Sequence, residues 1–213
     1  MLSRPQTLLV AHALALIAIL FWLVPYLTGT YGTNGYLFTF VFYWLAFCVP
    51  VTLIHVLPNR GPRLFSEKLE RRDWFVPLLV LAQVLLIAVA ALAPTTEILT
   101  TQGAMLALVF AVINGPLEEI AWRGGFMTRF ADRPRLGFWL GWLLFSAWHI
   151  PLSLSQGVLF DGGSVGLVAS AAVLGLFWNW IAWRTGSVFW VALAHALTNL
   201  AAFWALFERS GFI

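Results

Sequence analysis

Hydrophobic residues along this chain gather into seven long runs that are separated by short polar segments. Each run approaches or reaches the roughly 20 residues that an α-helix needs to cross the hydrocarbon core of a bilayer. The pattern therefore predicts seven membrane-spanning helices. The predicted spans are Thr7–Leu27, Tyr36–Leu57, Trp74–Ala93, Ala104–Trp122, Leu136–Leu154, Val165–Trp183 and Ser187–Phe207.

Composition indicates the same class of protein. Of the 213 residues, 61% are hydrophobic and 10% are charged, whereas a soluble globular domain has about 25% charged residues. A water-soluble chain of this size could not bury so much apolar surface. We therefore expect an all-α fold, a polytopic membrane helix bundle in which residues 1–213 form a single transmembrane domain.

Two features of the sequence limit other interpretations. The single cysteine, Cys48, excludes a disulfide framework and a zinc site built from cysteines. The first run could be a signal peptide, but only Arg4 precedes it and no small-x-small cleavage site occurs before Gly32. We therefore interpret the first run as a retained membrane helix.

The net charge of +3 is carried mainly by residues between the apolar runs, so it indicates membrane topology and gives no reason to expect a nucleic-acid partner. Cytoplasmic segments of membrane proteins collect Lys and Arg. With a cytoplasmic N-terminus, eleven of the twelve basic residues lie inside and only Arg209 lies outside. The eleven are Arg4, Arg60, Arg63, Lys68, Arg71, Arg72, Arg123, Arg129, Arg133, Arg135 and Arg184. We expect a multi-pass protein, and the short loops favour a prokaryotic plasma membrane.

Ionisable side chains also occur inside five of the runs. His12 and His55 lie near the ends of the first two runs and are interpreted as interface or packed histidines. An ionised group facing hydrocarbon costs several kcal/mol, so such residues usually face a cavity and carry function. The fourth run ends in Glu118, Glu119 and Arg123. His149 lies in the fifth run, and His195 lies in the seventh.

Helical spacing separates the two glutamates. Glu119 and Arg123 are four residues apart, which allows an ion pair along one helix face. Glu118 is rotated by about 100° from Glu119 and can point into the bundle. Gly115 and Pro116 predict a kink or a helix restart just before Glu118. After a restart both acids would lie in the first turn, where the helix dipole favours negative charge.

The three helices should bring their polar groups together. Phe145 and His149 share one helix face, and His195 and Asn199 share another, because both pairs are four residues apart. At about 1.5 Å per residue, Glu118, His195 and His149 lie roughly 8, 16 and 21 Å from the nearest basic residue at the inner end of their helices. We expect them to meet in the inner half or the middle of the membrane.

These residues form three motifs: EEIAWR at Glu118–Arg123, FSAWH at Phe145–His149 and HALTN at His195–Asn199. In this order they resemble the CPBP family of intramembrane proteases, which includes CAAX-processing (Rce1-type) endopeptidases and bacteriocin self-immunity proteins. The resemblance covers roughly Ala104–Leu206. It implies that the helices in residues 104–207 form the catalytic core and that those in residues 1–100 are peripheral. Relatives often have eight spans, whereas the hydrophobic pattern gives seven.

By this resemblance, the protein is an endopeptidase that cleaves a membrane-anchored or lipid-modified peptide entering from the cytoplasm or laterally from the bilayer. Glu118 would be the general base, assisted by His149, while His195 and Asn199 would stabilise the oxyanion. Glu119, Arg123 and Phe145 would support the site. In the second mechanism that the residues allow, Glu118, His149 and His195 bind a catalytic zinc and leave one position open for water. The sequence leaves both mechanisms open.

Three other interpretations fit the intramembrane polar groups less well. A purely structural polar core would need fewer groups than the six present here. A proton-coupled transporter would also use Glu and His, but the chain shows no inverted repeat. A non-catalytic scaffold or immunity protein would bind a partner helix, and replacement of Glu118 by Gln would leave such a function intact.

Overall fold

The computed structural model of the chain describes residues 1–59 and 64–212, in which the regular secondary structure is entirely helical. This confirms the predicted all-α class. The α-helices are α1 (Arg4–Tyr31), α2 (Thr33–Tyr43), α3 (Val49–Val51), α4 (Val76–Leu92), α5 (Thr101–Glu119), α6 (Gly125–Arg129), α7 (Pro134–Leu152), α8 (Gly163–Thr185) and α9 (Phe189–Arg209). Wider π-helical turns occupy Trp44–Cys48, Thr52–Val56 and Ile120–Gly124, and 3-10 turns occupy Leu57–Asn59, Arg71–Asp73 and Ala93–Thr95.

The seven predicted runs correspond to seven helical segments, because α2 continues through α3 to Asn59 and α5 continues through α6 to Arg129. Within the described residues, six segments are long and apolar enough to cross a membrane. The segment outside this set is α7, whose 19 residues would span about 28 Å. Its glycines, tryptophans and His149 make α7 less apolar than the other six segments, although its length suffices to cross a membrane.

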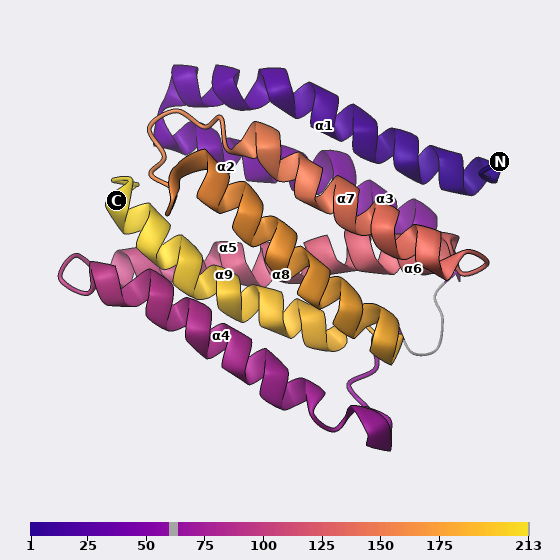
Figure 1. The fold of residues 1–213 in the computed structure, drawn as a ribbon. Coiled ribbons are helices and arrows are strands. Elements are labelled where there is room, and N and C mark those ends of the chain that lie inside the picture. The colour runs from indigo at the N-terminus through magenta and orange to yellow at the C-terminus, as the bar shows by residue number, and fades with distance from the viewer. Residues whose placement is uncertain (60–63, 213) are drawn as a thin grey trace.

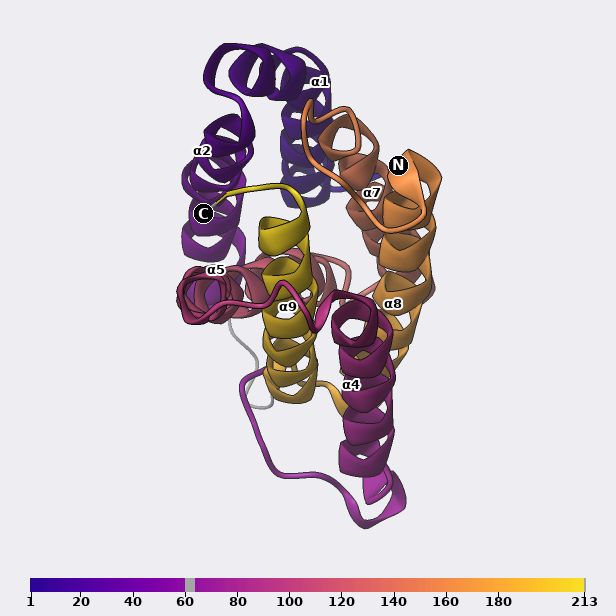
Figure 2. The same ribbon diagram turned by 90° about the vertical axis from the view of Figure 1, so that its left-hand side faces the viewer.

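Helix α9 lies near the centre of the bundle, with α5 and α8 on either side and α4 against it (Figure 2). Half of the most apolar stretch of α9 is buried inside the bundle, whereas 17% of the corresponding stretch of α4 is buried. Helices α5 and α9 approach each other closely at Gly115, where an added Cβ would lie 2.6 Å from the backbone nitrogen of Ala196. Glycine at this position therefore allows α5 and α9 to place their polar residues next to each other.

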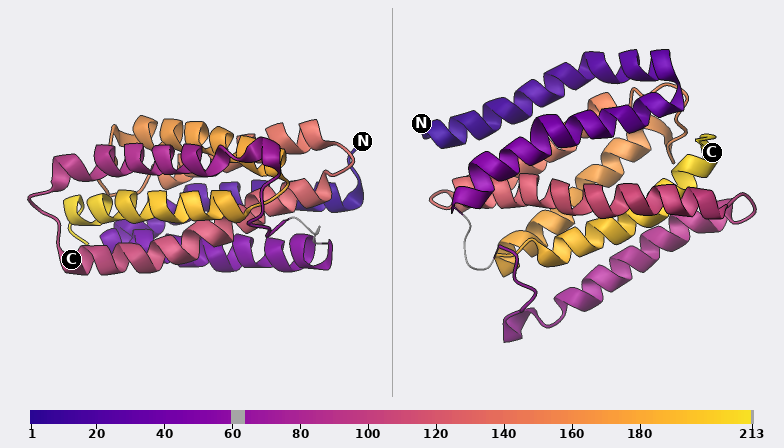
Figure 3. Two further views of the ribbon diagram at one scale, coloured as in Figure 1. Left: turned by 90° about the horizontal axis from the view of Figure 1, so that it is seen from below. Right: turned by 180° about the vertical axis from the view of Figure 1, so that it is seen from behind.

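The basic residues of the loops gather at one end of the bundle, which we call the basic end. It contains the N-terminus, the α6–α7 turn, the α8–α9 turn and the segment before α4 (Figures 1 and 3). Gln6 donates to the carbonyl of Arg129, and Arg184 pairs with Asp73 at 2.6 Å. The opposite end carries the α4–α5 turn, the α7–α8 loop and the C-terminus. The predicted cytoplasmic location of the basic end stays a prediction.

Two basic residues used for that prediction, Arg60 and Arg63, lie outside the described residues. A third was interpreted wrongly as part of an inner segment. Arg123 is 1% exposed and lies within the bundle, so it carries no topological information. Its charge is neutralised by protein partners and not by water at the membrane surface.

The expected kink or restart before Glu118 is wrong. Helix α5 runs through Gly115 and Pro116 without a break and ends at Glu119, where the wide turn Ile120–Gly124 follows. Close packing of α5 on α9 keeps the segment helical despite the missing N–H of Pro116. The two glutamates therefore lie in the last turn of α5, and the dipole of a helix N-terminus does not stabilise them.

Candidate functional site

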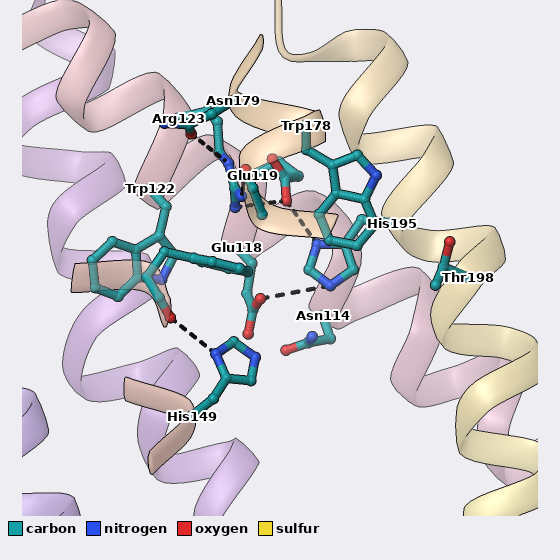
Figure 4. A network of polar contacts seen from close by, with 12 residues as sticks. Asn114, Glu118, Glu119, Trp122, Arg123, His149, Trp178, Asn179, His195 and Thr198 are labelled. Atoms are coloured by element: carbon teal, nitrogen blue, oxygen red, sulfur yellow. Dashed lines mark hydrogen bonds and ion pairs between the residues drawn. The ribbon is translucent and has the colours of Figure 1, made fainter. Parts of the chain in front are cut away.

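The two adjacent glutamates of α5 point into different surroundings (Figure 4). Glu118 is 1% exposed and Glu119 is fully buried. Neither carboxylate oxygen of Glu118 has a hydrogen-bond partner of adequate geometry among the described residues, whereas Oε1 of Glu119 is bonded to two side chains. The structure thus bears out the separation of the two acids that their helical spacing predicts.

Glu119 is the anchor of a buried ionic network. Its Oε1 atom accepts from Nη1 of Arg123 at 3.0 Å and lies 2.7 Å from Nδ1 of His195. The guanidinium of Arg123 also donates to Oδ1 of Asn179 and to the carbonyl of Gly175, each at 3.0 Å. The network thereby connects α5, α8 and α9.

The ring of Phe145 covers the same guanidinium, with its centroid 3.9 Å from Cζ of Arg123. A guanidinium over an aromatic face is attracted by the negative charge density of the ring. Phe145 therefore shields the ionic network on the α7 side. This contact agrees with the supporting position that the sequence assigned to Phe145.

The contacts of His195 fix the protons on its ring. Because a carboxylate only accepts hydrogen bonds, Nδ1 of His195 must donate to Glu119. The other ring nitrogen, Nε2, lies 3.6 Å from Oε2 of Glu118. Nε2 of His195 therefore faces the carboxylate of Glu118, and a proton on Nε2 would lie between the two groups.

His149 of α7 lies on the other side of the cluster. Its Nδ1 atom lies 2.9 Å from the carbonyl oxygen of Phe145, which can only accept, so Nδ1 carries the proton. Nε2 of the neutral ring is then left with a free lone pair. Trp148 packs against the imidazole at 4.2 Å between ring centroids and stacks on Tyr43 at 4.4 Å. These aromatic rings hold His149 in place.

Glu118, His149, His195 and Asn199 all line one cavity of about 330 Å³. The structure thus brings the four predicted residues to a common space from three helices. Two polar groups in the wall lack partners among the described residues: the carboxylate of Glu118 and Nδ2 of Asn199. One is an acceptor and the other is a donor, so the cavity can receive a ligand that offers both.

Several polar residues of the site were missed by the sequence reasoning. Trp178 of α8 stacks on His195 at 4.2 Å, with 27° between the ring planes. Its indole nitrogen donates to Oε1 of Gln83 at 3.2 Å, and Nε2 of Gln83 donates to Oγ1 of Thr198 at 2.9 Å. Gln83 thus connects α4 to both α8 and α9.

Asn114 is a further residue that the sequence reasoning missed. It lies one helical turn before Glu118 and beside it (Figure 4). Its side-chain oxygen accepts from Nε1 of Trp44 at 2.7 Å. Isolated polar residues in apolar runs were the available signal for Gln83, Asn114 and Asn179. Their partners lie far away in the sequence, so the spacing within one helix could not reveal them.

The arrangement of the same residues determines whether they can share a metal ion. The 3.6 Å between Glu118 and His195 is close to the roughly 3.4 Å that separates two ligands of one tetrahedral zinc. Among the described residues, however, no three His, Cys, Asp or Glu side chains are placed to hold one ion together. The set Glu118, His149 and His195 therefore does not fit a three-ligand site in this arrangement, and the zinc mechanism stays an untested prediction.

Fold and site together define a polytopic helical membrane protein that encloses a cluster of acidic, imidazole and amide groups. Residues 99–201 match the family model described as type II CAAX prenyl endopeptidase Rce1-like, which is slightly less than half of the chain. Over this segment the chain is similar to the Rce1-like family, as its motifs indicate. This similarity supports a protease as the class of enzyme. No curated protein and no solved structure gave a match.

Proposed function

We propose that this protein is an intramembrane endopeptidase that hydrolyses a peptide bond of a membrane-associated substrate. In this proposal a water molecule lies beside Glu118, whose carboxylate removes a proton while the oxygen attacks the substrate carbonyl. A positioned general base of this kind contributes about 10²–10⁴-fold to a rate. The proton then passes to the leaving amine, so Glu118 returns to its starting state.

The two histidines have different roles in this proposal. His195 is held by Glu119 through Nδ1, so a proton on Nε2 points toward Glu118 and the reacting carbonyl. It can stabilise the oxyanion together with Asn199. His149 presents a lone pair at Nε2 and accepts a hydrogen bond from the attacking water, which orients the water. Glu119, Arg123 and Phe145 hold these groups without touching substrate.

One observation carries the proposal: among the described residues, a buried carboxylate and a buried amide donor in one cavity wall both lack hydrogen-bond partners, although His195 lies 3.6 Å from the carboxylate. Unpaired buried polar groups cost about 1–3 kcal/mol each and are rarely retained without a reason. A water on Glu118 and a peptide carbonyl on Asn199 would satisfy both. A structural polar core would pair these groups with each other or with neighbouring helices.

Replacement of Asn199 by Ala is expected to lower kcat by about 10²–10³-fold, the usual effect of losing one oxyanion donor. KM should change little, because the donor acts on charge that develops in the transition state. Steady-state kinetics on the purified protein would measure both constants. A variant whose loss appears only in KM would assign Asn199 to substrate binding instead.

Gln83 is expected to act as a positioning residue. Gln83→Leu removes the hydrogen bond from Trp178 and the hydrogen bond to Thr198 but keeps most of the side-chain volume. We expect kcat to fall about tenfold with an unchanged KM, and Gln83→Glu to retain more activity than Gln83→Leu. Val84→Leu, at the neighbouring position of α4, is the control. Equal activity of Gln83→Leu and the wild type would show that the Trp178 contact does not influence the reaction.

The proposal is tested by a cleavage assay on purified protein, combined with metal analysis. The probe is a fluorogenic prenylated CAAX peptide, chosen because the matched family is described by that substrate. Because the three candidate ligands line one cavity but are not placed to hold one ion together, we expect cleavage without stoichiometric zinc and without inhibition by a chelator. Loss of activity on chelation that zinc restores would favour the zinc mechanism. A folded protein that cleaves no membrane-associated peptide would favour a scaffold.

A further inference from the structure

The carboxylate of Glu118 lies in a row of side chains that the N-terminal half of the chain holds at two points. Asn114 and Trp122 are four residues before and four residues after Glu118, so the three side chains follow one another on successive turns. Tyr43 and Trp44, at the junction of α2 with the π-helical turn after it, bind the two outer members of this row. Both lie outside the segment that matches the family model.

The two contacts are hydrogen bonds between buried side chains. Nε1 of Trp122 donates to the hydroxyl of Tyr43 at 2.6 Å, and Nε1 of Trp44 donates to Oδ1 of Asn114 at 2.7 Å. Each of these four side chains is at most 8% exposed. Hydrogen bonds are stronger in such surroundings than in water. The two bonds therefore fix the end of α2 against the chain on both sides of Glu118.

The bond from Trp44 determines which way the amide of Asn114 points. An indole N–H only donates, so the amide oxygen must face Trp44 and the amide nitrogen must point elsewhere. Asn114 lines the cavity, and its side chain interacts with that of Glu118 (Figure 4). A carboxylate only accepts, so the amide nitrogen is the group that suits this neighbour. The interaction falls short of hydrogen-bond geometry, and a small rotation of either side chain would complete it.

An amide at position 114 is costly unless it serves a purpose. Asn114 is 2% exposed and lies in an apolar run of α5, where an aliphatic side chain would pack without needing polar partners. Burial of an amide is unfavourable unless hydrogen bonds compensate for the lost water. The compensation comes from Trp44 on one side and is available from Glu118 on the other.

From these contacts we infer that Asn114 is a positioning residue for Glu118 and that Trp44 influences the reaction by orienting Asn114. The inference rests on the proposed function. A donor to the carboxylate restricts its rotation, and the carboxylate keeps further lone pairs for the water that it deprotonates. Helix α2 thereby contributes to the site through Trp44, although Trp44 does not touch the reacting atoms.

Asn114→Asp tests the inference most directly, because it keeps an oxygen for Trp44 and replaces the donor toward Glu118 by an acceptor. We expect kcat for the prenylated CAAX peptide to fall at least about tenfold with an unchanged KM, as the loss of a hydrogen bond to a charged group predicts. Trp44→Phe frees the amide to turn and should lower kcat about fivefold. The control is Trp142→Phe, which removes an indole donor to the carbonyl of Ala172 outside the site and should change kcat less than about twofold.

Two double variants separate positioning from a merely structural effect. If Trp44 acts through Asn114, Trp44→Phe should change kcat by less than about twofold in an Asn114→Leu background, because the effects of coupled residues do not add. Asn114→Asp should also lower the unfolding temperature in detergent by at least about 4 °C, because it places two carboxylates side by side. Glu118→Gln in the same protein should restore that temperature, since the pair then again has one donor and one acceptor.

Three results would each overturn the inference: wild-type kcat in Asn114→Asp, additive losses from Trp44→Phe and Asn114→Leu, or an unfolding temperature that Glu118→Gln does not restore. The unfolding measurement does not depend on turnover. A wild-type protein that cleaves no peptide would contradict the proposed function, whereas a restored unfolding temperature would still show that Asn114 holds Glu118.

Discussion

Glu118→Gln is expected to lower kcat by about 10²–10⁴-fold, the range contributed by a positioned general base, while the fold stays intact. The amide keeps the shape of the side chain but cannot accept a proton from water. Stability should be retained, because the substituted carboxyl group makes no hydrogen bond with the described residues and contacts His195 only at 3.6 Å. Cleavage of the prenylated CAAX peptide and thermal unfolding in detergent would be measured on the same preparation.

Glu119→Gln is the matched control, since it makes the same chemical change one residue further along α5. Glu119 accepts from Arg123 and His195, so this variant should unfold at a lower temperature as well as lose activity. The two adjacent substitutions are therefore expected to separate chemistry from stability. Full turnover by Glu118→Gln would remove Glu118 from the mechanism.

Arg123→Ala is expected to cost the fold about 3–5 kcal/mol, the usual penalty for leaving one partner of a buried ion pair without compensation. The substitution would strand the carboxylate of Glu119 and would remove the donors to Asn179 and Gly175. It would also leave space beneath the ring of Phe145. Unfolding by heat or denaturant in detergent would measure the loss.

The control for Arg123→Ala is Arg209→Ala, which breaks the ion pair with Asp161 at the surface. Asp161 is 61% exposed in its side chain, and exposed ion pairs contribute about 0.2–1 kcal/mol. The two arginine variants should therefore differ severalfold in their effect on stability. A loss below 1 kcal/mol for Arg123→Ala would mean that the buried network is not a main determinant of the fold.

Much of the architecture could be predicted from the sequence, because membrane helices are encoded locally. A run of about 20 apolar residues forms a helix wherever it meets lipid, since its backbone groups can be satisfied only within the segment. The number of helical segments and the ion pair of Glu119 with Arg123 follow from such local rules. The convergence of Glu118, His149 and His195 was expected because each would otherwise face hydrocarbon.

What the sequence could not provide depends on contacts between distant segments. Pro116 predicts a break locally, but packing of α5 on α9 at Gly115 keeps the helix continuous. The stacking of Trp178 on His195 requires α4 to place Gln83 beside α8.

The shared carboxylate of Glu119 has a consequence for protein engineering. Because this carboxylate contacts both Arg123 and His195, any redesign must keep the sequences of α5 and α9 together. Ala90 and Ser170 line the cavity but are not part of that network. Libraries randomised at these two positions should therefore alter selectivity while the hydrolytic machinery is left untouched.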